Sequence, residues 1–163
     1  FTNHKLHGFI TRAFSHTGPR RGKTFSISCD AYQLALMMAG SPERILHVGN
    51  LKTVRVVMDV RDTARAYYLL MQSEGSDGNV YNVCGSVPHQ MEHYTDTLIE
   101  LSRLQGVEKR VDPELFRPID IQCQIGDCAP LVELTGWKER FSIKTTISDL
   151  LKYWANKLVC PKI

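Results

Sequence analysis

The chain has 163 residues, of which 43% are hydrophobic and 23% are charged, and its formal net charge is +3. This length is enough for one domain with a core but not for two full domains. The weak charge and the scattered Lys and Arg residues argue against a nucleic-acid-binding protein, and no apolar run approaches the roughly 20 residues that span a bilayer. We therefore expect neither nucleic acid nor membrane as a partner.

The first residues, Phe1–Lys5, show neither an initiator Met nor the apolar segment of a signal peptide. His89 and His93 are spaced like two metal ligands on a helix, but a solvated helix face is the simpler interpretation, and we expect no metal site. We expect a cytoplasmic fragment of a longer protein. Without any Cys-x-x-Cys pair, the five cysteines are interpreted as reduced thiols: Cys29, Cys84, Cys123, Cys128 and Cys160.

Apolar patterning in the first half predicts alternating helices and short strands, which is typical of an α/β fold. Gly40 is expected to end the first helix, and Gly49 and Asn50 are expected to turn the chain between two strands that form a hairpin. The expected elements are a strand at 8–14, a loop at 15–22, a helix at 26–39 and strands at 45–48 and 54–60.

The second half continues the alternation and ends in the clearest helix of the chain. Its apolar residues recur at helical spacing from Ile143 to Leu158, and Ser142 can cap its first turn, so the stripe indicates core packing. The segments 8–14 and 80–84 are isolated in sequence, and we expect them to share a sheet that leaves an edge unpaired. The expected elements are helices at 62–72, 90–104, 130–135 and 143–158, and strands at 80–84 and 109–111.

The sequence contains no Gly-x-Gly-x-x-Gly phosphate loop, and Tyr32, Tyr81 and Tyr94 are not followed four residues later by Lys. We therefore expect no catalytic residue in the chain and no turnover by the chain alone. Arginines in loop-like contexts are prominent instead, and Arg suits bidentate recognition of phosphate, although a surface ion pair is the alternative for each. These are Arg12, Arg20, Arg21, Arg55, Arg61 and Arg117.

Five segments, in their order along the chain, resemble blocks of GDP-mannose 4,6-dehydratase and its reductase relatives in the extended short-chain dehydrogenase/reductase family. The resemblance runs from about residue 8 to residue 154, and each block alone would be a weak signal. Ser15 stands where the family often has Asn, and Val56 where relatives commonly carry Asp. The segments are Ile10–Gly22, His47–Arg55, Asp59–Tyr67, Val80–Cys84, and Arg117–Asp120 with Thr135–Trp137.

The resemblance implies that residues 1–163 are the C-terminal, substrate-binding part of an extended Rossmann-type enzyme. This part would include strands that belong to the sheet of an absent N-terminal domain. That domain would hold most of the NADP or NAD and the catalytic Tyr and Lys, just before residue 1. The resemblance also implies a GDP-sugar substrate and a homo-oligomer, either a dimer or a tetramer.

The same resemblance suggests roles for individual residues. Arg55, Arg117 and Asp120 are expected to hold the nucleoside diphosphate, with Ser15 and Lys23 as further substrate contacts. The expected cofactor contacts are His16, Arg20 and Arg21. We interpret Thr17 to Thr24 as an interface or anion-binding loop, and a solvated basic loop is the alternative.

The implied reaction is the dehydration of GDP-mannose to GDP-4-keto-6-deoxymannose. A GDP-4-keto-6-deoxymannose reductase or another sugar-nucleotide epimerase is the close alternative. A third possibility is a nucleotide-sensing or scaffold protein that keeps the fold without catalysis.

Overall fold

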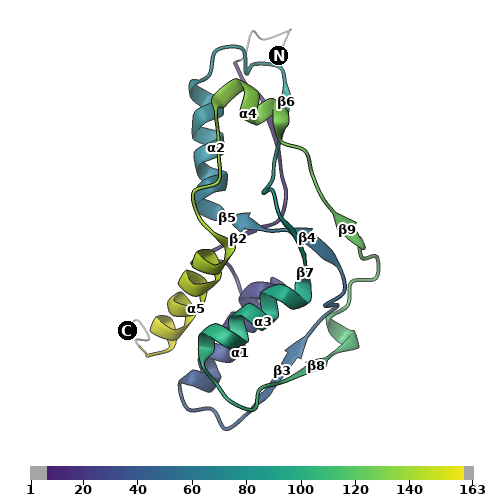
Figure 1. Cartoon of the computed structure of the whole chain (residues 1–163), viewed down its shortest axis with the longest axis vertical. Coiled ribbons are helices and arrows are strands. Elements are labelled where there is room, and N and C mark those ends of the chain that lie inside the picture. The colour runs from purple at the N-terminus through teal and green to yellow at the C-terminus, as the bar shows by residue number, and fades with distance from the viewer. Residues whose placement is uncertain (1–6, 160–163) are drawn as a thin grey trace.

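A computed structural model describes residues 7–159, and Cys160 lies outside these residues. The molecule is long, with strands β1 and β6 and helices α2 and α4 toward one end, and helices α1, α3 and α5 toward the other (Figure 1). Two separate groups of buried apolar residues match these two ends. Within the described residues, no helix is both long enough and apolar enough to cross a membrane.

The first end is built on the two strands that the sequence places in one sheet. β1 (Ile10–Ala13) pairs in parallel with β6 (Val80–Val83), which confirms that prediction, and among residues 7–159 neither strand pairs with a third. α2 (Val60–Gln72) and α4 (Ala129–Thr135) flank the pair. The buried apolar side chains here are Met58, Ala66, Leu70, Tyr81, Val83, Leu131 and Trp137.

The second end is a packed group of three helices, as their apolar faces predict. They are α1 (Ser26–Met38), α3 (Met91–Ser102) and α5 (Ile143–Val159). The stripe of α5 is buried, with Ile147 and Leu150 fully covered, and the Ser142 hydroxyl accepts a hydrogen bond from the Thr145 N–H at 3.1 Å. Both the packing role of α5 and its N-terminal cap are therefore confirmed.

The predicted hairpin around Gly49 and Asn50 is wrong, because the two strands pair with other segments. β3 (Ile45–Val48) pairs in parallel with β8 (Glu108–Val111), whereas β4 (Val54–Val56) lies between β7 and β9. The remaining strands are β2 (His16–Thr17), which pairs with β5 (Met58–Asp59), β7 (Pro88–Gln90) and β9 (Cys123–Gln124).

The predicted strand 54–60 is two short strands, β4 and β5, separated at Val57, and its last residue, Val60, is the first of α2, with Asp59 as the N-cap. The Asp59 carboxylate accepts a hydrogen bond from the Arg61 N–H at 2.7 Å, as an N-cap does. The same carboxylate accepts from the Arg61 guanidinium and from the Thr146 hydroxyl, both at 2.7 Å, and Arg61 also contacts Asp149 at 2.9 Å. These contacts join the start of α2 to α5, and so join the two ends of the molecule.

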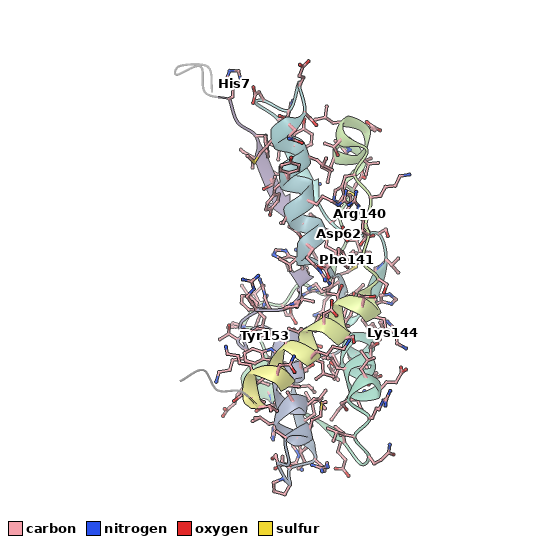
Figure 2. All side chains as sticks on the ribbon, turned by 90° about the vertical axis from the view of Figure 1, so that its left-hand side faces the viewer. His7, Asp62, Arg140, Phe141, Lys144 and Tyr153 are labelled. Carbon is pink, nitrogen blue, oxygen red and sulfur yellow. The ribbon has the colours of Figure 1, made fainter. Side chains whose placement is uncertain are left out.

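A second buried carboxylate, Asp62, holds the segment that leads into α5. It accepts hydrogen bonds from the backbone N–H groups of Arg140 and Phe141 at 2.9 and 3.1 Å, and these three residues lie together in Figure 2. Trp137 donates its indole N–H to the Asp62 carbonyl at 3.0 Å. The path from α4 to α5 is thus fixed by hydrogen bonds to the first turn of α2.

Candidate binding cavity

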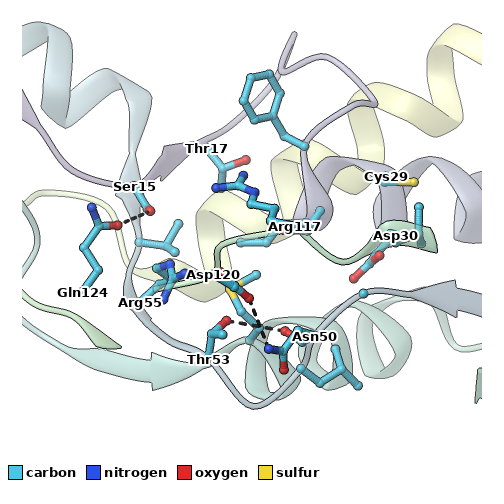
Figure 3. A pocket seen from close by; sticks show the side chains of 18 of the residues that line it. Ser15, Thr17, Cys29, Asp30, Asn50, Thr53, Arg55, Arg117, Asp120 and Gln124 are labelled. Carbon is cyan, nitrogen blue, oxygen red and sulfur yellow. Dashed lines mark hydrogen bonds and ion pairs between the residues drawn. The ribbon is translucent and has the colours of Figure 1, made fainter. Parts of the chain in front are cut away.

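A cavity of about 590 Å³ is formed by segments that are distant in sequence. Its walls come from the end of β1 with β2, the first half of α1, the turn at 49–53, β4, the start of α3 and the stretch 115–121. This volume is in the range of pockets that hold a small molecule or cofactor. Figure 3 shows polar side chains pointing into this space from several of these segments.

The cavity brings together seven of the eight residues that the sequence analysis singled out. Arg55 and Arg117 share it, as predicted for two groups that bind one ligand, while their roles in binding stay predictions. Arg20 is exposed and lies outside the set of cavity-lining residues that the structure describes, with a positive φ of 72°. The lining residues from the predicted set are Ser15, His16, Arg21, Lys23, Arg55, Arg117 and Asp120.

Arg55 is held rigidly on β4. Its Nη2 donates to Asp120 Oδ1 at 3.1 Å and its Nη1 donates to the Val54 carbonyl at 2.8 Å, while only 11% of its side chain is exposed. The Tyr94 hydroxyl donates to the Arg55 carbonyl at 2.8 Å, which fixes the strand from the side of α3. The guanidinium has five N–H donors, so several remain for a ligand.

Asp120 is held in the cavity wall by two side chains. Asn50 Nδ2 donates to its second oxygen at 3.1 Å, so that the carboxylate bridges Asn50 and Arg55 and is not paired with Arg117. Residues 117–120 are irregular, and the short 3-10 helix lies earlier, at Pro113–Leu115. The Asp120 carboxylate therefore positions the guanidinium of Arg55, and both residues line the cavity.

Two cationic side chains of the basic loop, those of Arg21 and Lys23, lie over aromatic rings. The Arg21 guanidinium lies 3.4 Å from the centroid of the Phe25 ring, and Lys23 Nζ lies 5.0 Å from that of Tyr32. Gly18, at φ 152°, approaches Val60 so closely that an added Cβ would lie 2.8 Å from the Val60 Cγ1 atom. This close approach is to another part of the same chain, and the interface and anion-binding roles of the loop stay predictions.

Polar groups at the β2 side of the cavity are left with hydrogen-bonding capacity. The buried hydroxyl of Thr17 has no hydrogen-bond partner among residues 7–159, although it lines the cavity. His16 uses Nδ1 to contact the Phe14 carbonyl at 2.9 Å, and Ser15 Oγ is 3.5 Å from Gln124 Oε1. A buried hydroxyl without a partner costs stability, which indicates that a ligand or water completes it.

Sequence reasoning missed two further cavity residues, Asp30 and Thr95. Thr95 Oγ1 donates to Asp30 Oδ2 at 2.8 Å, and both residues are buried, with Asp30 only 4% exposed. Burial raises the pKa of Asp30 to about 7, and the hydrogen bond from Thr95 opposes this increase. The signal was available: Asp30 lies three residues after Ile27 and four before Leu34, on the apolar face of α1.

One Tyr–Lys pair at the four-residue spacing was also missed, Tyr153 and Lys157 on α5 (Tyr153 is labelled in Figure 2). The Tyr153 ring packs edge to face on Trp154 at 5.3 Å between centroids, and Lys157 Nζ lies 5.0 Å from the Trp154 centroid. Neither residue lines the cavity in the described part of the chain. The pair therefore contributes to the packing of α5 and offers no acid–base group to the cavity.

Comparison with known proteins gives one family. The family model described as GDP-mannose 4,6 dehydratase matches residues 2–150. The GDP-6-deoxy-D-mannose reductase of Pseudomonas aeruginosa is 31% identical over 91% of this chain and 48% of its own length. The human GDP-mannose 4,6 dehydratase is 24% identical over 85% of this chain and 41% of its own length. The chain thus spans about half the length of these relatives.

Solved structures give the same picture of the fold. RMD from Pseudomonas aeruginosa, complexed with NADPH, superposes with a TM-score of 0.82 at 30% identity, over 91% of this chain and 48% of that one. UDP-glucose 4-epimerase from Thermotoga maritima, with UDP-glucose, gives a TM-score of 0.81 at 20% identity, over 96% of this chain and 48% of that one. Both confirm the α/β class and the correspondence to part of an extended Rossmann-type enzyme.

Proposed function

The chain belongs to the GDP-mannose 4,6 dehydratase family, and we propose that it is the nucleotide-sugar-binding part of a GDP-mannose 4,6-dehydratase-like enzyme. The observation that carries the proposal is the cavity in which Arg55 and Arg117 meet. A diphosphate offers several charged oxygens close together, and two guanidiniums on one cavity can engage them from two directions.

The setting of the two arginines supports this assignment. Arg55 is positioned by Asp120 and by its own strand, so little side-chain entropy is lost when it binds. Arg117 lies on an exposed, irregular stretch and can adjust to the ligand. Lys23, Ser15 and the unpaired Thr17 hydroxyl line the same cavity and would contribute further contacts.

A nicotinamide cofactor would supply hydride acceptance and donation in such an enzyme. This chain would contact only a small part of the cofactor. Its sequence has no glycine-rich loop for the pyrophosphate, and of the expected cofactor contacts only His16 and Arg21 line the cavity. His16 keeps its second ring nitrogen for such a contact, because Nδ1 already faces the Phe14 carbonyl. Most of the NADP or NAD would be bound outside these residues.

Reduction of a GDP-linked 4-keto-6-deoxy sugar is the second candidate reaction. It is favoured by the 31% identity with a GDP-6-deoxy-D-mannose reductase, compared with 22% to 25% for the first dehydratases matched. Both reactions need the same GDP-sugar cavity, so the binding proposal holds for either. The two are distinguished by assaying a protein that also carries the expected dinucleotide-binding half with GDP-mannose and with the 4-keto product.

Calorimetric titration of the folded chain with GDP tests the binding proposal. We expect GDP to bind and the Arg117→Ala variant to bind it more weakly, because a charge-assisted hydrogen bond is lost. Lys144→Ala is the matched control, since Lys144 lies on α5, pairs with Glu100 and is outside the cavity lining that the structure describes. Failure of GDP to bind a chain whose circular dichroism shows it folded would refute the proposal.

A further inference from the structure

Asp30 is a buried carboxyl group with unused hydrogen-bonding capacity. It lines the cavity from α1 and is 4% exposed, and Thr95 donates to its Oδ2 at 2.8 Å. Its other oxygen, Oδ1, accepts no hydrogen bond from any of residues 7–159. A carboxylate can accept about four hydrogen bonds, and burying one with a single partner is unfavourable. Asp30 is therefore suited to a ligand that brings its own donors.

The position of Asp30 along the cavity indicates which part of a nucleotide-sugar it would meet. In Figure 3, Ser15 and Gln124 lie on one side, the guanidiniums of Arg55 and Arg117 are nearer to that side, and Asp30 lies on the other. With the arginines on the diphosphate, the two remaining portions of the ligand extend in opposite directions. The sugar belongs beside Ser15 and His16, which adjoin the expected cofactor, so the nucleoside extends toward Asp30.

We propose that Asp30 selects the nucleobase, its carboxylate accepting hydrogen bonds from the adjacent ring N–H and exocyclic amino group of guanine. The inference rests on the proposed nucleotide-sugar binding and adds the residue that distinguishes the base. Guanine presents two neighbouring donors, which match the two oxygens of one carboxylate. Uracil presents a single ring N–H between two carbonyl oxygens, and those oxygens would face the carboxylate lone pairs and repel it.

The surroundings of Asp30 favour such selection. Four apolar side chains, Ile27, Leu51, Val57 and Met91, line the same cavity as the Asp30–Thr95 pair. Hydrogen bonds to a charged group are stronger where water is excluded, and a mismatched base would leave the carboxylate unpaired. Thr95 fixes the carboxylate by one hydrogen bond to Oδ2, which leaves Oδ1 and a second acceptor position on Oδ2 for the ligand.

Calorimetry with GDP, inosine diphosphate and UDP on the wild-type chain and on Asp30→Asn tests the proposal. Inosine diphosphate keeps the ring N–H of GDP and lacks only the amino group. We expect the order GDP, then inosine diphosphate, then UDP, and a loss of roughly tenfold or more in GDP affinity for Asp30→Asn, the size expected for hydrogen bonds to a charged group. UDP affinity should change little. Asp96→Asn, the same change at an exposed α3 site, should leave all three affinities unaltered.

The outcomes separate this inference from the function beneath it. If none of the nucleotides binds to the folded chain, the proposed function fails and the inference fails with it. If GDP and UDP bind equally well, or if Asp30→Asn weakens both to the same extent, nucleotide binding stands and the assignment of Asp30 is overturned. A GDP preference that Asp30→Asn removes, with the fold intact by circular dichroism, supports the proposal.

Discussion

Replacing Asp30 with Asn is expected to stabilise the ligand-free protein near neutral pH, although the wild-type carboxyl has a hydrogen-bond partner. Burial raises the pKa of Asp30 to about 7 in the folded state. In the unfolded chain an Asp ionises near pH 4, so the folded state holds a proton that the unfolded state has released between about pH 4 and pH 7. Raising the pH through this window therefore favours unfolding.

The size of the effect follows from the two ionisation equilibria. A tenfold change in an equilibrium is about 1.4 kcal/mol, so a pKa that moves from about 4 to about 7 costs at most roughly 4 kcal/mol of stability above pH 7. Below about pH 4 the cost vanishes, because both states are protonated. Asn resembles the protonated carboxyl in size and neutrality, so the two proteins should have similar stability there.

Urea unfolding at pH 4, 5.5, 7 and 8 measures this difference. The free energy of unfolding of Asp30→Asn, minus that of the wild type, should be near zero at pH 4 and should grow to between about 1 and 4 kcal/mol by pH 8. Asp96→Asn should show no such trend, since Asp96 is exposed and exposed pairs contribute roughly 0–1 kcal/mol. A difference that does not depend on pH, or that favours the wild type as pH rises, would contradict the reasoning.

Three further predictions concern Arg55, Asp59 and the two arginines of the basic loop. Arg55→Ala should weaken GDP binding by on the order of 2 kcal/mol, the loss of a charge-assisted hydrogen bond, and normal binding by calorimetry would make the site assignment wrong. Asp59→Ala should lower the free energy of unfolding at pH 7 by about 2 kcal/mol, from the lost N-cap and buried hydrogen bonds. Although burial opposes it, hydrogen bonding to Arg61 lowers the pKa of Asp59, so this contribution should be present above about pH 4 and disappear at lower pH in acid titrations. In a protein that also carries the dinucleotide-binding half, replacing Arg20 and Arg21 with Ala should change oligomer size by light scattering or cofactor affinity, and no change in either would refute the loop assignment.

The helices could be predicted from the sequence because their signals are local. In α5 the apolar repeat and the Ser142 cap lie within the segment itself, and its observed start at Ile143 agrees with them. Strand pairing is different, because alternation shows that a segment is extended but not which strand lies beside it. β3 pairs with Glu108–Val111, about sixty residues away, and no local feature of Ile45–Val48 indicates this. A short Gly–Asn turn therefore suggested the nearest strand as the partner, and suggested it wrongly.

The cavity residues, like the strand partners, could not be grouped from local sequence features. Arg55 and Arg117 could be placed together only through family resemblance, since 62 positions of chain separate them and neither has a distinctive local pattern. The contact of Arg55 with Asp120 could not be foreseen, because it depends on an irregular stretch whose path is set by tertiary structure.

Asp30 is the opposite case, because its sequence position alone was informative. Asp30 is the one acidic residue on the buried face of α1, where its neighbours Ile27, Ala31 and Leu34 are apolar. Such a residue must be paired, protonated or reserved for a ligand, since an isolated buried charge is costly. Thr95 supplies one hydrogen bond, and the pKa near 7 shows that this does not restore the ionised form to its usual stability. Burying the Asp30 carboxylate therefore costs free energy that hydrogen bonds from a ligand would offset. A base with two adjacent N–H donors would offset this cost better than a base with one.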